Sequence, residues 1–372
     1  MKVLVLGGGI VGEGIIYALK DRYEITVADI SRERLDYLKK RHDVNTLRID
    51  AEKEQLSNVM KGYDVISGTL PGKFGLKVIS EACKAGVNVV DNSFMPEDFY
   101  TMEDEVKKAE ITVIPDSGVA PGLSNMIVGH VASKYGNLEN VDIKVGGLPE
   151  KNLPPLGYKL LFSPMDTLDE YTRKVDIVRN SKILRAEPGD GIEYFFVNGL
   201  GSLEAFYTNG LRSLIRNVKA RNMTEKTIRF RGHMEKMKLL MDLGLLSDEA
   251  LDISGCSVSP KEVLANLLSK NLSFPEVPDI LYMEINITAT ESSELIRYQL
   301  FDRKDNKTGF SAMTRTTGFT NAAVTDLVCK GLIKEKGIVA PEIVAMDESN
   351  FKNILNFLSS FGVKVTGPDI NQ

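Results

Sequence analysis

Lys2-Val-Leu-Val-Leu-Gly-Gly-Gly-Ile-Val-Gly12 is the stretch that decides the fold of this chain. Residues 2–6 are apolar and rich in β-branched side chains, which favours a short buried strand. Residues 10–20 carry apolar side chains at helical spacing, and residues 24–28 form a second apolar run that ends at Asp29. The order strand, Gly7-x-Gly9-x-x-Gly12, helix, strand, acid is typical of a unit that binds a dinucleotide.

Each part of this motif has a physical role in holding NAD or NADP. Gly7 allows the tight turn, Gly9 lets backbone N–H groups approach the pyrophosphate, and Gly12 lets the helix lie close on the strand. The helix N-terminus attracts the phosphates. Glycines also occur in tight turns that bind nothing. The prediction therefore depends on the whole order of strand, glycines, helix, strand and acid. The residues expected to contact the cofactor are Gly7, Gly9, Ile10, Val11, Gly12, Asp29, Ile30, Thr69, Leu70 and Pro71.

The choice between the two cofactors depends on the residues after the second strand. A carboxylate at Asp29 can accept both hydroxyls of the adenosine ribose and repels a 2′-phosphate, so NAD is favoured. NADP stays the alternative, because the nearby Arg32 and Arg34 are able to hold a 2′-phosphate.

Length and composition narrow the class of protein. The 372 residues suit two domains, and the net charge of −5 argues against nucleic acid as a partner. No apolar run approaches the ~18–20 residues of a membrane span, and the first strand begins too early for a signal peptide. Three scattered cysteines and three histidines exclude a disulfide framework and argue against a metal site. We therefore expect a cytoplasmic protein.

The alternation of strands and helices continues to residue 114 and predicts a doubly wound parallel sheet, a Rossmann fold in the α/β class. The turn at residues 68–72 lies at the carboxyl end of this sheet, where such folds bind ligands. Asp91 and Asp116 follow two further strands at the same edge. Aspartates in such turns either cap the next helix or face a substrate.

The pattern changes at Pro121, after which hairpins and loops indicate an α+β substrate domain with a mostly antiparallel sheet. Residues 281–290 alternate strictly between apolar and polar, as a half-buried strand does, and residues 295–301 form its partner. A helix over 311–332, interrupted near Gly318, leads to a tail of strand 339–344, helix 349–361 and strand 363–365. We expect this tail to return to the Rossmann domain, so that 1–120 with 315–372 form one domain and 121–314 the other. The polar row on residues 282–290 suggests a homodimer surface or, alternatively, the wall of a pocket.

Several short motifs beyond the glycine fingerprint are distinctive: Asp91-Asn-Ser93, Asp116-Ser-Gly118, Pro121-Gly122, Gly146-Gly-Leu-Pro149, Leu156-Gly-Tyr158, Glu204-Ala-Phe206, Thr208-Asn-Gly-Leu-Arg212, Thr227-Ile-Arg-Phe230, Gly232-His233 and Leu243-Gly244. With them the sequence resembles the saccharopine dehydrogenase family over nearly its whole length, above all the lysine 6-dehydrogenase branch. In this pattern Arg231 stands where a proline is usual.

The resemblance implies NAD(P)-linked oxidation of an amino acid at a carbon that bears an amine, followed by hydrolysis of the imine. This chemistry needs a base for the amine proton and a cation for the substrate carboxylate. The candidate catalytic residues are Asp116, Tyr158 and His233, and the candidate substrate-binding residues are Asp91, Gly147, Arg212 and Arg229. Each has a structural alternative: a helix cap for the aspartates, a local hydrogen bond for the histidine, a packed ring for the tyrosine and an ion pair for the arginines.

Three enzymatic readings and one non-enzymatic reading stay open. The first is L-lysine 6-dehydrogenase, which yields a semialdehyde that cyclises to piperideine-6-carboxylate. The second is a saccharopine dehydrogenase or reductase, whose substrate carries three carboxylates and for which Arg231 provides an extra cation. The third is a carboxynorspermidine-type dehydrogenase. A non-catalytic NAD-binding sensor would lack convergent polar groups in the second domain, whereas this chain retains Tyr158, Arg212, Arg229 and His233.

Overall fold

The computed structural model describes residues 1–292 and 294–370, and the chain divides into two compact units. Unit 1 consists of Met1–Gly136, Arg216–Val218 and Thr314–Val365, and unit 2 of Asn137–Ile215, Lys219–Met313 and the residues after Val365. Among the described helices, none combines the length and the apolar character that a membrane span requires.

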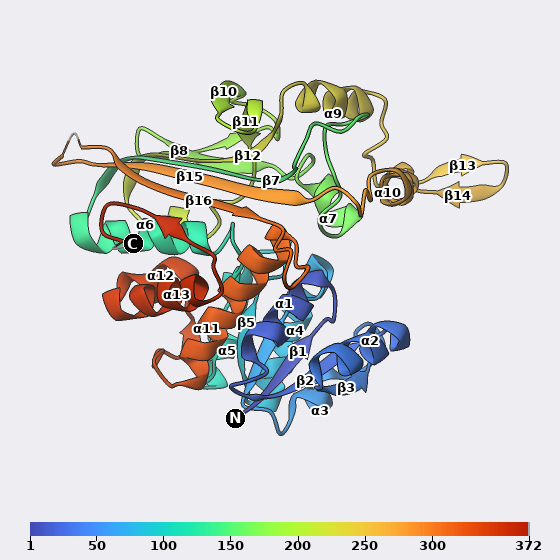
Figure 1. The fold of residues 1–372 in the computed structure, drawn as a ribbon, viewed down its shortest axis with the longest axis vertical. Coiled ribbons are helices and arrows are strands. Elements are labelled where there is room, and N and C mark those ends of the chain that lie inside the picture. The colour runs from blue at the N-terminus through green and yellow to red at the C-terminus, as the bar shows by residue number, and fades with distance from the viewer. Residues whose placement is uncertain (293, 371–372) are drawn as a thin grey trace. The chain divides into compact units, whose positions relative to one another are not determined.

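Unit 1 is built on a parallel sheet with the strand order β17-β6-β5-β4-β1-β2-β3. This is the order of the Rossmann fold, so the predicted doubly wound sheet is confirmed. Figure 1 labels β1, β2, β3 and β5 of this sheet. The strands are β1 (Lys2–Leu6), β2 (Glu24–Asp29), β3 (Asn45–Arg48), β4 (Val65–Gly68), β5 (Asn88–Asp91), β6 (Thr112–Ile114) and β17 (Gly337–Ile338). The helical segments are α1 (Ile10–Leu19), α2 (Arg32–His42), α3 (Leu56–Met60), η1 (Gly72–Phe74), α4 (Gly75–Ala85), η2 (Phe99–Met102), α5 (Glu103–Lys108), α6 (Leu123–Tyr135), η3 (Thr314–Gly318), α11 (Phe319–Cys329), α12 (Pro341–Met346) and α13 (Glu348–Ser360).

Both faces of this sheet are covered, which explains why its strands are continuous apolar runs. Leu4 and Leu6 of β1 pack in one cluster with side chains of α3, α4 and α5. Val3 and Val5, which point to the other face, are equally buried. Helix α11 packs on β4, β5 and α1. The C-terminal segment therefore returns to the Rossmann sheet, as the sequence predicts.

One element of this tail differs from the expectation. The strand predicted over 339–344 is wrong, because β17 is confined to Gly337–Ile338 and helix α12 begins at Pro341. Proline is favoured at the first position of a helix, where its missing N–H group is not needed. The β-branched residues Ile343 and Val344 mimic a strand in the sequence, yet they lie inside this helix.

Unit 2 contains a mixed, mostly antiparallel sheet with the order β10-β11-β12-β7-β15-β16, and the β8–β9 hairpin pairs with β12. Only the pairing of β12 with β7 is parallel along this order. The strands are β7 (Leu138–Pro149), β8 (Val175–Arg179), β9 (Lys182–Ala186), β10 (Glu193–Val197), β11 (Gly201–Tyr207), β12 (Ala220–Phe230), β13 (Leu251–Ile253), β14 (Cys256–Val258), β15 (Asp279–Ala289), β16 (Ile296–Arg303) and, at its border, β18 (Val365–Thr366). The helices are α7 (Pro164–Asp169), α9 (His233–Asp242), α10 (Pro260–Asn271) and, divided between the two units, α8 (Leu214–Asn217).

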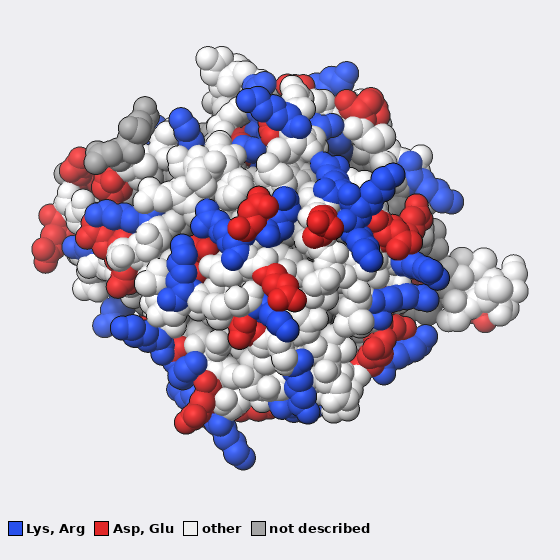
Figure 2. Space-filling model, turned by 60° about the horizontal axis from the view of Figure 1, so that its bottom comes forward, with Lys and Arg blue, Asp and Glu red and all other residues white. Residues whose placement is uncertain are grey.

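The predicted alternation in β15 is confirmed, since Leu281, Met283 and Ile285 are buried while Glu284 and Asn286 are partly exposed. The sequence did not reveal β11, and it revealed only the last residues of β12. On the surface, lysines and arginines alternate with aspartates and glutamates over the face drawn in Figure 2. This mixture of both signs matches the modest net charge.

Candidate functional site

The glycine-rich loop joins β1 to α1 and combines tight packing with one open position. A Cβ atom on Gly12 would lie 2.0 Å from the carbonyl oxygen of Gly7, and Gly7 itself has φ +102°. These two glycines are required by the local geometry. A Cβ atom on Gly9 would meet no atom within 4 Å. The space in front of Gly9 is therefore open, as the approach of a pyrophosphate requires.

Helix α1 presents its N-terminus to this space. Its N-cap is Gly9, which has no side chain to occupy the first amides of the helix. The N-terminal amides and the helix dipole attract an anion. Two apolar side chains nearby are exposed, Ile10 by 46% and Ile30 by 58%. Such apolar surface suits a planar base, so the residues present fit a dinucleotide.

Asp29 stands at the end of β2 beside the glycine-rich loop. Its Oδ2 accepts a hydrogen bond from the Gly8 amide at 2.7 Å, and its Oδ1 accepts one from the Ser31 amide at 2.8 Å. Each carboxylate oxygen keeps a lone pair that can accept a ribose hydroxyl. The carboxylate is therefore held beside the glycine-rich loop, and its contact with a ribose stays a prediction.

The turn after β4 lies next to the same loop. β1 and β4 pair in parallel, and the Thr69 amide donates to the carbonyl of Leu6 at 2.9 Å. A Cβ atom on Gly7 would lie 2.7 Å from the carbonyl oxygen of Thr69. The predicted contact residues of the two turns, Thr69 to Pro71 and Gly7 to Gly12, therefore gather at one sheet edge.

Asp91 is the last residue of β5 and Asp116 follows β6 at this edge, and both are buried. Oδ1 of Asp91 accepts hydrogen bonds from the amide and the hydroxyl of Ser93. Oδ2 of Asp91 has no hydrogen-bond partner among the described residues. Burial, together with the negative charge of Asp116, raises the pKa of Asp91 to about 6 although the Ser93 bonds oppose this shift. Asp91 is thus a carboxyl group with an unused oxygen and a pKa near neutrality, which suits proton transfer.

In unit 2, a second group of polar side chains is enclosed among α7, β12 and α9. Arg229 pairs with Glu170 at 2.7 Å and lies 4.6 Å above the ring centre of Tyr158. The Tyr158 hydroxyl and Nε of Arg229 have no hydrogen-bond partner among the described residues. Burial raises the pKa of Tyr158 to about 12, so this phenol stays protonated at neutral pH. The two unused donors can serve an anionic group of a substrate.

His233 is held in this group by both ring nitrogens. Nδ1 lies 2.8 Å from the carbonyl oxygen of Leu156, and Nε2 lies 2.7 Å from the hydroxyl of Tyr171. A carbonyl only accepts, so Nδ1 carries the proton, and Nε2 accepts from Tyr171. Burial and the positive charge of Arg229 lower the pKa of His233 to about 3. The imidazole is neutral at physiological pH and orients Tyr171, while its role in proton transfer stays a prediction.

Four further acidic or phenolic residues shape these sites and escaped the sequence analysis: Glu13, Glu170, Tyr171 and Glu225. Glu225 is buried, accepts from Thr208 at 2.7 Å, and has its pKa raised to about 8 by burial. No local motif marks these residues, because each acquires its partner from a distant segment. Glu204, which belongs to a recognised motif, accepts from the amides of Gly232 and Met234 and so caps α9.

The other two predicted substrate residues have clear structural surroundings. Gly147 lies in β7, where a Cβ atom would come within 2.7 Å of Leu161 and 2.9 Å of Met313. Arg212 has φ +50° and is half-buried. Gly147 thus has a packing role, and a contact of either residue with substrate stays a prediction.

A parallel sheet in the Rossmann order, with a glycine-rich loop and an open helix N-terminus at its carboxyl edge, is the arrangement that NAD(P)-dependent oxidoreductases use to bind their cofactor. Family models agree in both parts of the chain: the saccharopine dehydrogenase NADP binding domain matches residues 3–114, and the saccharopine dehydrogenase C-terminal domain matches residues 118–363. The chain belongs to the saccharopine dehydrogenase family, and the predicted family is confirmed.

Curated relatives and a solved structure agree with this assignment. α-Aminoadipic semialdehyde synthase of Bos taurus is 24% identical over 91% of this chain and 45% of that protein. Saccharopine dehydrogenase (NADP(+), L-glutamate-forming) of Saccharomyces cerevisiae is 27% identical over 72% of this chain and 63% of that protein. The chain therefore spans less than two thirds of the length of either relative. A structure of apo saccharopine dehydrogenase (L-Glu forming) from the same yeast shares the fold, with a TM-score of 0.78, 21% identity and 99% coverage of both chains.

Proposed function

We propose that this protein oxidises an amino acid at a carbon bearing an amine, with L-lysine at its ε-amine as the substrate and NAD as the acceptor. The observation that carries the proposal is the buried carboxyl group of Asp91, whose Oδ2 is unused and whose pKa is raised to about 6. It stands at the sheet edge where the cofactor-binding turns gather. A substrate ammonium group needs such an acceptor before its carbon can lose a hydride.

The proposed reaction has two stages, an oxidation of the amine and a hydrolysis of the product iminium ion. When bound, NAD supplies the acceptor for one hydride from the carbon next to the nitrogen. The ammonium group gives up one proton, which Asp91 accepts, and the nitrogen lone pair forms the second bond of an iminium ion. Water then adds to the iminium carbon, ammonium leaves, and the aldehyde of the semialdehyde product remains. Asp91 is neutral once it has accepted this proton, and the charge of the neighbouring Asp116 favours the positive charge of the iminium ion.

The charges of unit 2 support a substrate with few carboxylates. Arg229 is the buried cation of the polar group among α7, β12 and α9, and it is already paired with Glu170. Arg231, the extra cation of the sequence motif, is exposed and stacks on Tyr194 at 4.8 Å. Lysine carries only one carboxylate. Saccharopine, with three carboxylates, demands more cations than this cluster offers.

Saccharopine is nevertheless the second candidate, because the relatives named above are saccharopine dehydrogenases and a related synthase. A reduction assay with NAD and NADP against L-lysine, saccharopine and carboxynorspermidine decides among them. We expect L-lysine to give the highest kcat/KM and a product that cyclises. A preference for saccharopine would replace the lysine proposal, and the absence of turnover with every amine would leave a nucleotide-binding sensor.

NAD is expected to bind more tightly than NADP. The Asp29 carboxylate, which the Gly8 and Ser31 amides hold beside the glycine-rich loop, would repel a 2′-phosphate at the adenosine ribose. Like charges brought together in a binding site cost several kcal/mol when poorly screened. Titration calorimetry of the free enzyme with each nucleotide measures this directly. The competing expectation is a preference for NADP, because the family model that matches residues 3–114 is described as an NADP binding domain. Equal or tighter binding of NADP would overturn the preference.

Asp91→Asn is expected to lower kcat/KM on the order of a hundredfold or more, as the loss of a general base does. In the wild type, kcat/KM should fall as the pH drops below about 6, because Asp91 becomes protonated there. The variant should lose this acidic limb of the pH profile. Asp98→Asn removes a charge from an exposed residue seven positions further along the chain and is the matched control. A variant that keeps both the rate and the limb would show that another group accepts the proton.

A further inference from the structure

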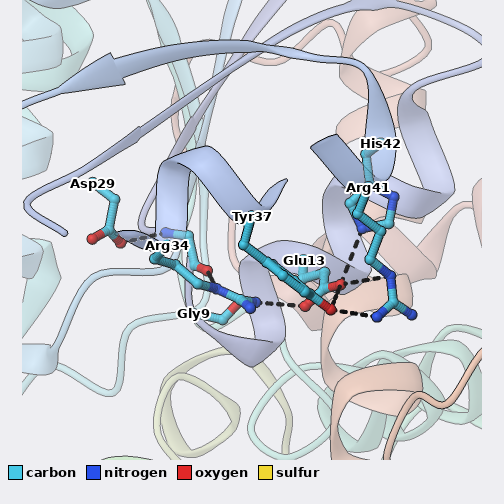
Figure 3. A network of polar contacts seen from close by, with 8 residues as sticks. Gly9, Glu13, Asp29, Arg34, Tyr37, Arg41 and His42 are labelled. Carbon is cyan, nitrogen blue, oxygen red and sulfur yellow. Dashed lines mark hydrogen bonds and ion pairs between the residues drawn. The ribbon is translucent and has the colours of Figure 1, made fainter. Parts of the chain in front are cut away.

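Arg34 lies across the glycine-rich loop at the rim of the nucleotide site (Figure 3). Its Nε donates to the carbonyl of Gly8 at 2.5 Å, and its Nη2 donates to the carbonyl of Gly9 at 3.2 Å. Asp29 binds the amide of the same Gly8 at 2.7 Å. Asp29, the acid proposed to select NAD, therefore binds the amide of Gly8. Arg34, a cation able to hold the 2′-phosphate of NADP, binds the carbonyl of the same residue.

The position of Arg34 is set by a buried acid from the first turns of α1. Glu13 is 6% exposed, and its Oε2 lies 2.5 Å from Nη2 of Arg34. Its Oε1 lies 3.2 Å from Nε of Arg41 and 3.1 Å from Nε2 of His42. The Arg34 guanidinium also stacks on the ring of Tyr37 at 4.8 Å. Glu13 is thus the centre of a network that neutralises and orients Arg34.

We propose that Glu13 is a specificity-determining residue for the cofactor: it ties Arg34 to the loop carbonyls and so withdraws it from the 2′ position of the ribose. Asp29 alone then faces the ribose, and NAD is selected. The inference deepens the proposed use of NAD and rests on it. It names a positioning residue that acts through Arg34 and touches no part of the cofactor.

The energetics explain why one acid can decide. Three of the five guanidinium N–H groups of Arg34 are used by Gly8, Gly9 and Glu13, and its charge is offset at hydrogen-bond distance. Moving the guanidinium to a phosphate would leave Glu13 buried and short of a partner, which opposes the movement. Without the charge of Glu13, the same movement would gain a charge-assisted bond to the phosphate. The remaining N–H groups, on Nη1, have no partner among the described residues and are at hand for it.

The test measures dissociation constants of NAD and NADP by titration calorimetry, without substrate, for four proteins: the wild type, Glu13→Gln, Arg34→Met and the double variant. Glu13→Gln should tighten NADP relative to NAD by roughly tenfold, the value of one added charge-assisted hydrogen bond. Arg34→Met in the wild-type background should leave the ratio of the two constants unchanged. The double variant should lose the gain made by Glu13→Gln.

Glu33→Gln is the matched control, since it removes the same charge from an exposed residue next to Arg34. The ratio of its dissociation constants for NAD and NADP should equal that of the wild type. An unchanged ratio in Glu13→Gln, or a selective loss of NADP binding in Arg34→Met, would overturn the inference. If Glu13→Gln does not fold, as thermal unfolding will show, Arg34→Met still decides. A wild type that binds neither nucleotide would instead contradict the proposed function.

Discussion

Gly9→Val is expected to fold as the wild type does and to lose at least about a hundredfold in affinity for both nucleotides. The loss corresponds to roughly two charge-assisted hydrogen bonds between the pyrophosphate and backbone amides. The substitution should affect binding and not folding, because a Cβ atom on Gly9 would have no protein atom within 4 Å. A valine side chain would therefore fill only the space that the phosphates need.

Gly12→Ala provides the contrasting variant in the same loop. Its Cβ atom would lie 2.0 Å from the carbonyl oxygen of Gly7, a backbone atom that cannot move without opening the turn. We expect Gly12→Ala to lower the melting temperature markedly, whereas Gly9→Val leaves it unchanged. Thermal unfolding and calorimetry with NAD on both variants make the comparison. Normal NAD binding by Gly9→Val would show that the pyrophosphate lies elsewhere.

Arg229→Met is expected to destabilise unit 2 by about 3–5 kcal/mol, because it leaves the mostly buried Glu170 without its cation. Arg229→Met combined with Glu170→Met should recover most of this stability, since an apolar pair of similar volume often replaces a buried ion pair without loss. Denaturant unfolding of the two single variants and the double variant forms the thermodynamic cycle. Additive effects would mean that the pair is not coupled.

Variants of Arg229 also distinguish its contribution to stability from its contribution to catalysis. If Arg229 holds the substrate carboxylate, the double variant should be stable yet poor in turnover. Arg229→Lys keeps the charge but loses the planar two-point contact, and should lower kcat/KM by the equivalent of roughly 2–5 kcal/mol. NAD affinity should not change in either. If Arg229→Lys keeps wild-type efficiency, the same substitution at Arg212 becomes the next test of the carboxylate contact.

The first unit was predictable because its signals are local. A β-branched run before three glycines, a helical period and a terminal acid all lie between residues 2 and 29. Strand β12 of unit 2 was mostly missed for the opposite reason. Its residues 220–227 are polar or mixed, and they become a strand through pairing with β7 and β11. The tail was misread at residues 339–344, where β-branched side chains outweighed the helix signal of Pro341.

The functional groups divide along the same line. The sequence by itself determined the dinucleotide loop, Asp29 and the aspartates at the strand ends, because turn chemistry and strand ends are written in neighbouring residues. Only the tertiary structure decided that Arg229 pairs with Glu170, that His233 is neutral between Tyr171 and Leu156, and that Arg34 is held by Glu13. These partners lie 21 to 77 residues apart. Desolvation and charge pairing depend on what the fold brings within a few ångströms, and no spacing in the sequence encodes that distance.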